Sequence, residues 1–304
     1  MKAWPILLAL SARACRGFSL SPTRPFVASA TAPDARSSVA QCAADADVPS
    51  VIVGGGRIGS LLASLGPSTL VKRGEAIPDG DGPIYVCTRN DALAPIIEAT
   101  PEHRRADLVF LQNGMLGKFL ASNGLAFNTQ VLLYLAVAKL GERPIDGITY
   151  LNPEGLTAAT GKWAEAFAAR LAKGNLKCRA LQGDMYTAAM LEKHVWICSF
   201  MMVGALNGGI SVGEVRDSHA DQMRALVAEL CAAGEAELSV SLPEGAYERL
   251  MAYGRSVSHF PTAIKEFEWR NGWFYDITKA ALASGKPDPC PLHTAGLKEL
   301  GVID

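Results

Sequence analysis

The stretch that decides the fold reads Val51-Ile52-Val53-Gly54-Gly55-Gly56-Arg57-Ile58-Gly59-Ser60-Leu61-Leu62-Ala63. Its three β-branched residues suit a buried parallel strand, and the leucine-rich residues after the glycines suit a helix. A strand, a Gly-x-Gly-x-x-Gly turn and a helix in this order are typical of a dinucleotide-binding unit. Gly54 then permits the tight turn, Gly56 lets a pyrophosphate approach the backbone, and Gly59 lets helix and strand pack closely. The alternative is a glycine-rich turn that binds nothing.

The next predicted strand, 68–71, ends at Lys72 and Arg73. A site that prefers NAD usually has an acidic residue there, which binds the 2′-hydroxyl of the ribose. Two cations instead favour a 2′-phosphate, because both the charge and the forked geometry of arginine suit it. We therefore expect NADPH rather than NADH as the cofactor, with a solvated basic turn as the alternative.

Strands and helices continue to alternate, which predicts an open parallel sheet. Expected strands cover 83–88, 108–111, 131–138, 148–151 and 176–181, and expected helical segments cover 92–97 and 161–172. Ligands of such sheets bind at the carboxyl ends of the strands, where Arg89 and Asn113 follow two of them. The predicted cofactor-binding residues are Gly54, Gly56, Arg57, Ile58, Gly59, Lys72, Arg73, Thr88, Arg89 and Asn113.

From Met185 onward the apolar residues recur with helical spacing. Lys193 lies on the apolar face, one turn from Met190 and from Trp196. It either extends out of the core or points into a cavity, where desolvation would lower its pKa toward a value useful for proton transfer. The apolar run 195–206 is shorter than the ~20 residues of a membrane-spanning helix. It suits a buried core helix or the interface of a homodimer.

The segment 253–274 is dense in both aromatic and polar residues. Glu266 precedes Arg270 by four residues, so one interpretation is an ion pair on a helix surface. With the pieces above, the chain resembles the ketopantoate reductase family, of the 6-phosphogluconate-dehydrogenase-like superfamily, over about residues 50–300. The resemblance rests on the turn 54–59, on Gln112-Asn113-Gly114, on Glu192-Lys193-x-x-Trp196, on 266–273, which is similar to the family's E-(I/L)-D-x-(I/L)-N-G, and on the tail from Gly285-Lys286-Pro287.

The resemblance implies catalytic roles for three residues. Lys193 would be the general acid toward the carbonyl oxygen of a 2-oxo acid, Glu266 would hydrogen-bond the substrate and Lys193, and Asn113 would place the substrate against the cofactor. The expected function is NADPH-dependent reduction of a small 2-oxo acid. The alternative is a non-catalytic NADP(H)-binding protein that kept the fold and lost the chemistry. The expected substrate-binding residues are Ser256 or Ser258, together with Asn271.

The chain departs from the family pattern at several places. Ile197 and Met201 occupy positions where the family's lysine helix carries substrate-binding asparagines. The chain between Arg73 and Tyr85 is about a strand and a helix shorter than usual, and the spacing from Ser256 to Glu266 is two residues shorter. The more apolar pocket indicates a 2-oxo acid other than ketopantoate, or no turnover.

The order of the expected strands and helices, together with the resemblance, predicts an α/β protein in which an abbreviated Rossmann-type domain, 48–184, precedes an all-α domain, 185–304. The chain has 304 residues, 49% of them hydrophobic, and 29 Lys and Arg against 30 Asp and Glu. This balance gives no sign of a nucleic-acid-binding surface, and no membrane partner is expected. The 7 cysteines form no Cys-x-x-Cys pair and no cluster with histidines, so we expect free thiols in a reducing compartment and no metal.

Residues 1–47 differ from the rest in composition. They are rich in Arg, Ser and Ala and poor in acidic residues, as organelle transit peptides are. A short apolar region, 4–10, and Ala12-Arg13-Ala14 add the form of a signal-peptide cleavage site. We therefore expect a targeting leader to an organelle, a plastid in preference to a mitochondrion. A secretory signal alone and an extension without an address are the alternatives.

Overall fold

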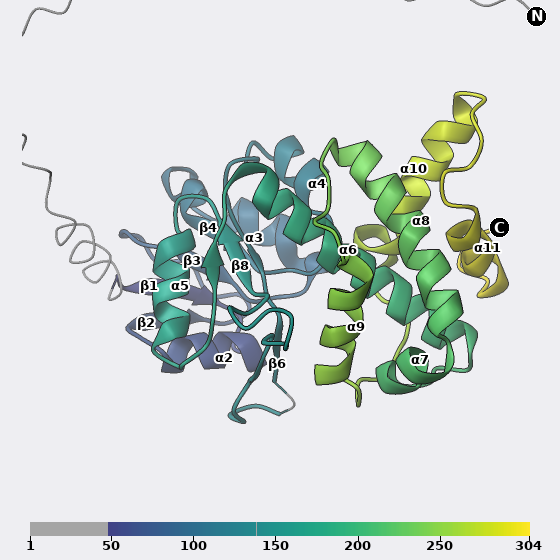
Figure 1. Ribbon diagram of the computed structural model, residues 1–304. Helices are drawn as coiled ribbons and strands as arrows, with labels where there is room; N and C mark the ends of the chain where they lie inside the picture. Colours follow the sequence, from purple (N-terminus) through teal and green to yellow (C-terminus); the bar gives the residue numbers. More distant parts are fainter. Residues whose placement is uncertain (1–47, 138) are drawn as a thin grey trace, which may run out of the picture.

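The computed structural model describes residues 48–137 and 139–304, which form a sheet domain and a helical domain side by side (Figure 1). The predicted leader lies outside the described residues. The sheet has seven strands in the order β2-β1-β3-β4-β5-β8-β9. The first five strands in this order, β2, β1, β3, β4 and β5, are parallel to one another. Strand β8 is antiparallel to β5, and β9 is parallel to β8. Their bounds are β1 Ser50–Val53, β2 Ser68–Val71, β3 Ile84–Val86, β4 Leu108–Phe110, β5 Thr129–Leu132, β8 Ala158–Thr160 and β9 Arg179–Ala180.

The central strands are buried on both faces, because helices cover both faces of the sheet and successive side chains of a strand point to opposite faces. In β1, Val51 and Val53 belong to one apolar cluster and Ile52 to another. The first cluster is completed by α3 (Leu93–Ala99) and α4 (Gly117–Ser122), and the second by α2 (Arg57–Ser64) and α5 (Ala164–Ala172). This two-sided burial explains why the strands read as continuous apolar runs rather than as alternating ones.

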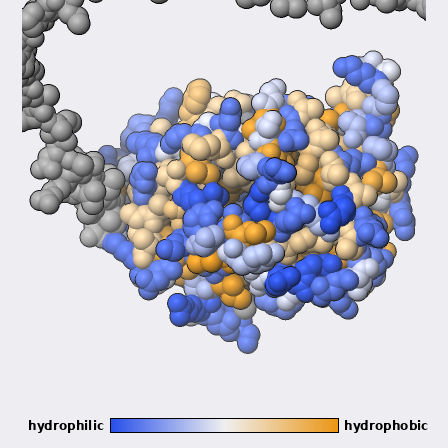
Figure 2. All heavy atoms as spheres, viewed as in Figure 1, coloured by the Kyte–Doolittle hydropathy of each residue, from blue (hydrophilic) through white to orange (hydrophobic). Residues whose placement is uncertain are grey.

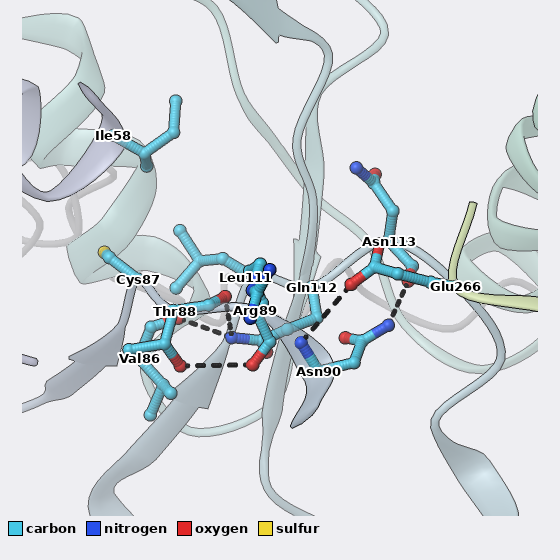
Figure 3. A pocket seen from close by; sticks show the side chains of 10 residues that line it. All are labelled: Ile58, Val86, Cys87, Thr88, Arg89, Asn90, Leu111, Gln112, Asn113 and Glu266. Atoms are coloured by element: carbon cyan, nitrogen blue, oxygen red, sulfur yellow. Dashed lines mark hydrogen bonds between the residues drawn. The ribbon is translucent and has the colours of Figure 1, made fainter. Parts of the chain in front are cut away.

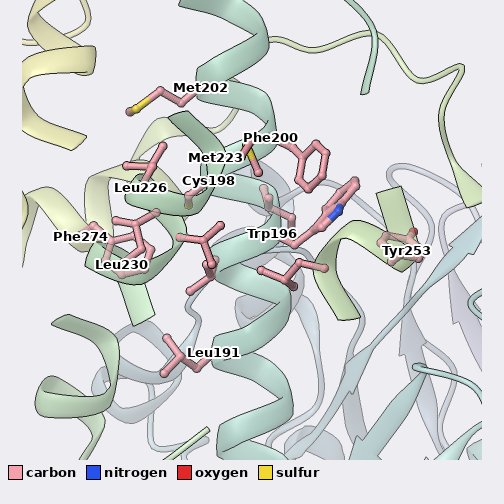
Figure 4. Close-up of a cluster of buried hydrophobic side chains, with 14 of the residues drawn as sticks. Leu191, Trp196, Cys198, Phe200, Met202, Met223, Leu226, Leu230, Tyr253 and Phe274 are labelled. Carbon is pink, nitrogen blue, oxygen red and sulfur yellow. The ribbon is translucent and has the colours of Figure 1, made fainter. Parts of the chain in front are cut away.

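The helical domain surrounds the long helix α6 (Gly183–Leu206), whose apolar side chains point in all directions (Figure 4). This helix is long and apolar enough to cross a bilayer, but 67% of its most apolar window is buried inside the protein, as in a core helix. Gly234 of α8 allows a close crossing, because a Cβ there would lie 2.3 Å from Leu191 Cδ1. The other helices are α7 Val212–Ser218, α8 Ala220–Leu238, α9 Ala246–Ser256, α10 Asn271–Ala283 and α11 Pro291–Glu299.

The predicted fold class, an α/β domain followed by helices, is confirmed, but two of the expected strands are not formed as predicted. The expected strand 148–151 is wrong, because this segment is a loop with Tyr150 69% exposed, and β8 begins only at Ala158. The expected strand 131–138 is interrupted after Leu132, and a separate hairpin of β6 (Leu135–Ala136) and β7 (Ile145–Asp146) follows. Figure 2 shows apolar side chains gathered in the middle of this face of the molecule, toward the helical domain.

The cysteines of the described part of the chain are free, as expected: Cys87, Cys178, Cys198, Cys231 and Cys290. Burial raises the pKa of Cys87, of Cys178 and of Cys290 to about 12, so these thiols stay protonated and unreactive at neutral pH. They act as small apolar side chains of the core.

Candidate active site

The glycine turn before α2 has the geometry that a dinucleotide requires. Gly54 has a φ of +102°, and a Cβ there would lie 2.9 Å from the main-chain oxygen of Cys87. A Cβ on Gly59 would lie 1.9 Å from the main-chain oxygen of Gly54, so only glycine lets α2 pack on β1. A Cβ on Gly56, in contrast, would have no atom within 4 Å, and no side chain caps the start of α2. Open space and uncapped N–H groups at a helix start suit a pyrophosphate.

A cavity of about 210 Å³ lies beside this turn, at the carboxyl ends of β3 and β4 (Figure 3). Four predicted cofactor-binding residues, Ile58, Thr88, Arg89 and Asn113, line it, and so does Glu266 from the helical domain. The sheet edge therefore brings together residues that are far apart in sequence, as ligand sites of open parallel sheets require.

Asn90 and Gln112 hold the wall of this cavity, and neither was predicted as a site residue. Gln112 Nε2 donates hydrogen bonds to the main-chain oxygens of Val86 (2.8 Å) and Thr88 (3.1 Å), and Asn90 Nδ2 donates to the main-chain oxygen of Asn113 (2.9 Å). The side-chain oxygens of Asn90 and Gln112 are buried without a protein partner. Such acceptors suit the hydroxyl or amide donors of a bound dinucleotide. Their position directly after predicted strands was the signal that could have found them.

Three predicted cofactor-binding cations, Arg57, Lys72 and Arg73, lie outside the lining of this cavity. Arg57 Nη1 donates to the main-chain oxygen of Val137 (2.8 Å) and so connects α2 to the chain beyond β6. Lys72 and Arg73 lie on the exposed turn that follows β2. The Glu75 carboxylate accepts a hydrogen bond from the main-chain N–H of Lys72 (2.7 Å), which places an acidic group beside the two cations. No sequence pattern had indicated this contact.

Lys193 points inward from α6 and is only 7% exposed. Its Nζ donates a hydrogen bond to the main-chain oxygen of Leu133 (2.8 Å) and lies 4.9 Å from the centre of the Tyr134 ring. Burial, and after it the positive charge of Arg270, lower the pKa of Lys193 to about 7. A lysine with such a pKa can exchange a proton near neutral pH, which is what general acid–base catalysis requires.

A second, very small cavity adjoins Lys193. It is lined by Lys193, His194 and Ile197 of α6 and by Gln112, Asn113 and Gly114 of the sheet domain. Its volume of about 10 Å³ has room for one water molecule at most. Gln112 and Asn113 line both cavities, so the predicted general acid and the cavity beside the glycine turn meet at these two residues.

Glu266 does not make the contact with Lys193 that the resemblance implied. Its carboxylate forms an ion pair with Arg270 and accepts a long hydrogen bond, 3.5 Å, from the main-chain N–H of Asn90. Lys193 is directed to Leu133 instead, so within the described residues no hydrogen bond joins the two predicted catalytic groups. The interpretation of an ion pair on a helix surface is right about the pair and wrong about the helix. Glu266 has a φ of +48° and precedes the short 3₁₀ turn Phe267–Trp269.

The predicted substrate-binding residues lie away from both cavities. Ser256 is the last residue of α9, and the main-chain oxygen of Ser258 accepts a hydrogen bond from Gly213 N–H of α7 (2.8 Å). Asn271 is 1% exposed, and its Oδ1 lies 3.0 Å from Nε2 of His293 inside the helical domain. The buried amide of Asn271 thus stabilises the packing of α10 against α11, and its role in substrate binding stays a prediction.

The 3₁₀ turn 267–269 connects the two domains. The main-chain N–H of Met115 donates to the main-chain oxygen of Trp269 (2.9 Å), and the Trp269 ring packs edge-on against Phe119 of α4. Gly114 has a φ of +121°, and a Cβ there would lie 2.4 Å from the same Trp269 oxygen. The loop that carries Asn113 is therefore held directly against the segment that carries Glu266.

His194 is a further site residue that sequence reasoning missed. It is 1% exposed, and burial lowers its pKa to about 3, so the imidazole is neutral at neutral pH. Its Nε2 donates to the main-chain oxygen of Arg270 (3.1 Å), and the ring stacks on Phe274. His194 thus fixes the backbone of Arg270 against α6.

Three solved structures illustrate what this fold is similar to. 2-Dehydropantoate 2-reductase from Methylococcus capsulatus superposes with a TM-score of 0.62 at 15% identity, over 84% of this chain and 96% of that one. Ketopantoate reductase from Ralstonia eutropha gives 0.60 at 17% identity, over 84% and 99%. D-Mandelate dehydrogenase in complex with NADH gives 0.60 at 13% identity, over 84% and 98%.

At these identities the comparison establishes the fold. The chain has the two-domain fold of ketopantoate reductases, as its motifs had indicated, and this fold is shared with an NADH-binding dehydrogenase. No protein-family model and no curated protein sequence matches the chain.

Proposed function

We propose that this protein is an NADPH-dependent reductase of a small 2-oxo acid, similar to ketopantoate in its reacting group. One observation carries the proposal. A buried lysine with a pKa near 7 lines a cavity that shares Asn113 with the dinucleotide-type cavity beside the glycine turn. The reduction of a ketone needs a proton donor close to the cofactor site.

Different residues of the chain would bind the cofactor, donate the proton and orient the substrate in this reaction. The turn 54–59 and the start of α2 hold a dinucleotide, which in its reduced form supplies the hydride for the carbonyl carbon. Negative charge develops on the carbonyl oxygen as this carbon is reduced, and the ammonium of Lys193 stabilises that charge and then gives its proton to the oxygen. Asn113 orients the substrate between the two cavities, while Ile197, which lines the cavity beside Lys193, suits an apolar substituent better than a hydroxylated one.

The preference for NADPH rests on Lys72 and Arg73, whose charges suit a 2′-phosphate. Glu75 acts against them, because its carboxylate lies beside the same turn. We expect the Lys72→Ala, Arg73→Ala double variant to bind NADPH about tenfold or more weakly while its NADH affinity stays unchanged. Glu75→Gln removes the opposing negative charge from the same turn, so we expect it to increase the preference for NADPH. Equal loss of both dinucleotides in the double variant would contradict the proposal.

A non-catalytic NADP(H)-binding protein is the second candidate. The observation in its favour is the space beside Lys193, which has room for one water molecule and not for a 2-oxo acid. The absence of a Lys193–Glu266 hydrogen bond among the described residues points the same way.

The deciding experiment is to titrate the protein with NADPH and NADH and then to follow nicotinamide absorbance with a panel of 2-oxo acids that includes ketopantoate. Turnover that Lys193→Ala abolishes without weakening NADPH binding would support the reductase. NADPH binding without turnover across the panel would favour the non-catalytic protein. If neither dinucleotide binds, both candidates fail.

We also propose that residues 1–47 direct the protein to a plastid, because their composition is that of a transit peptide. A fluorescent protein fused after residue 47 tests this, and mitochondrial or secretory localisation would contradict it.

A homodimer is proposed as well, since one protein of this fold is described as a dimeric ketopantoate reductase. Sedimentation equilibrium of the purified protein decides between monomer and dimer.

A further inference from the structure

We infer that Arg270 is the specificity-determining residue that binds the carboxylate of the 2-oxo acid. The inference rests on the proposed function, because it names the part of the substrate that this same site recognises. It assigns to Arg270 a role in binding substrate rather than a purely structural ion pair with Glu266.

The first support is the residue type at this position. In the E-(I/L)-D-x-(I/L)-N-G segment that 266–272 resembles, the fifth position is apolar, and here it is Arg270. The same chain has Ile197 and Met201 where the resemblance expects asparagines. Compared with the family pattern, α6 therefore lacks amide side chains at these two positions, and the segment that His194 of α6 contacts carries a guanidinium. Such an exchange suits a substrate with an anionic head and an apolar side chain.

The second support is that Arg270 contacts residues that line both cavities. Its guanidinium pairs with Glu266, which lines the larger cavity, and its main-chain oxygen accepts the hydrogen bond of His194, which lines the smaller one. It is also close enough to Lys193 to act on it electrostatically. The side chain is 15% exposed, so an anion that reaches it is largely shielded from water.

The third support is unused hydrogen-bonding capacity. A guanidinium has five N–H donors in one plane, and Glu266 is bound through Nη2 alone. The Nε of Arg270 is buried and has no partner in the described residues. An unpaired buried donor is costly, and a carboxylate is the group that pairs with an arginine edge through two parallel hydrogen bonds.

The fourth support is the chemical match to a 2-oxo acid, in which the carboxylate and the carbonyl are on adjacent carbons. When the carboxylate is bound to Arg270, the carbonyl oxygen in this arrangement faces Lys193, the second cation of the site. The two cations repel each other in the free protein. An anion bound between them offsets this repulsion and favours the protonated form of Lys193, which is the form that can donate to the carbonyl oxygen. Substrate binding and the protonation of Lys193 are thus coupled.

The experiment compares a carboxylate with its neutral ester on the complete protein saturated with NADPH. The probes are oxamate, a non-reducible 2-oxo acid analogue, and ethyl oxamate, and their dissociation constants are measured by calorimetry. We expect Arg270→Met to weaken oxamate binding by about 100-fold, because a two-point charge-assisted contact is lost. We expect the affinities for ethyl oxamate and NADPH to change less than twofold. Arg216→Met, which removes an arginine from the α7 ion pair with Asp217, is the matched control and should change none of the three.

If Arg270 has only a structural role, its substitution changes the three affinities in a different pattern, so the result distinguishes the two roles. Equal weakening of oxamate, ethyl oxamate and NADPH, or no effect on oxamate, overturns the inference. If Arg270→Met does not fold, Arg270→Lys decides instead, since it keeps the charge but not the fork and should weaken oxamate alone by about tenfold. Failure of the proposed function is separate: the wild type then reduces no 2-oxo acid, although Arg270 still discriminates oxamate from its ester. If the wild type with NADPH does not bind oxamate, Arg270 is not a carboxylate-binding residue.

Discussion

Gly56 and Gly59 belong to the same motif but are needed for different reasons. Gly59 is required for the packing of the fold, and Gly56 is required for the proposed ligand binding. Gly59 faces the backbone of Gly54 at a distance that no Cβ can occupy, whereas Gly56 faces open space. We expect Gly59→Ala to lower the free energy of unfolding by about 1–3 kcal/mol, as overpacking in a core does. Urea unfolding monitored by circular dichroism measures this change.

Gly56→Ala is the matched control for Gly59→Ala. Its added methyl group meets nothing in the protein, so the free energy of unfolding should stay within about 0.5 kcal/mol of wild type. The same methyl group occupies the space proposed for the pyrophosphate, and NADPH should therefore bind at least about tenfold more weakly. If Gly56→Ala destabilises the fold as much as Gly59→Ala does, or leaves NADPH binding intact, the open space is not a ligand site.

The titration of Lys193 gives a second prediction for a single residue. A general acid works only when protonated, and the pKa of Lys193 is lowered to about 7. We expect kcat/KM to be constant below this pH and to fall as the pH rises through about 7, since kcat/KM reports the free enzyme. A rate that stays constant up to pH 9 would exclude Lys193 as the acid.

The same lowered pKa affects stability, with a sign that can be worked out. In the unfolded chain the lysine titrates near 10.5, so between about pH 7 and 10.5 the unfolded state binds more protons than the folded state. Stability that depends on Lys193 therefore rises with pH across this window. We expect Lys193→Met to remove this rise and to be more stable than wild type at neutral pH, as chemical denaturation at several pH values would show.

At the scale of elements, sequence patterns predicted the units that depend on local chemistry. The β1–α2 unit follows from its glycines, and the burial of α6 follows from its apolar run. The strand expected at 148–151 failed, because an apolar tetrapeptide can equally lie in a surface loop when no neighbouring strand pairs with it. Spacing along one segment indicated the ion pair of Glu266 with Arg270, but it could not reveal that Lys193 hydrogen-bonds Leu133 of the sheet domain instead of Glu266.

The contact between the loop 112–116 and the 3₁₀ turn 267–269 gives a prediction for elements. Gly114 and Gly124 both have positive φ, but only a Cβ on Gly114 would meet an atom, the Trp269 oxygen. We expect Gly114→Ala to lower the melting temperature by several degrees more than Gly124→Ala, which carries the backbone strain alone. Calorimetry of the two variants isolates the contribution of the contact. Equal losses would mean that the contact between the domains adds nothing to stability.

At the scale of the whole molecule, the proposed chemistry requires the two domains to separate. The cavity beside Lys193 has room for one water molecule, whereas a 2-oxo acid must place its carbonyl group there and its carboxylate at Arg270. The hydrogen bond from Met115 N–H to the Trp269 oxygen crosses between the domains and must break when they part. Buried strand amides such as that of Val109 in β4 stay protected during such a motion.

Native-state hydrogen exchange measures this opening directly. We expect the Met115 amide to exchange through a local opening of lower free energy and weaker denaturant dependence than the Val109 amide, which exchanges only on global unfolding. Adding NADPH with oxamate should slow exchange at Met115, because a ligand held by residues of both domains favours their closed arrangement. If both amides exchange with the same free energy and the same denaturant dependence, the domains do not open below global unfolding. The space beside Lys193 then admits no substrate, and the protein binds a dinucleotide without reducing a 2-oxo acid.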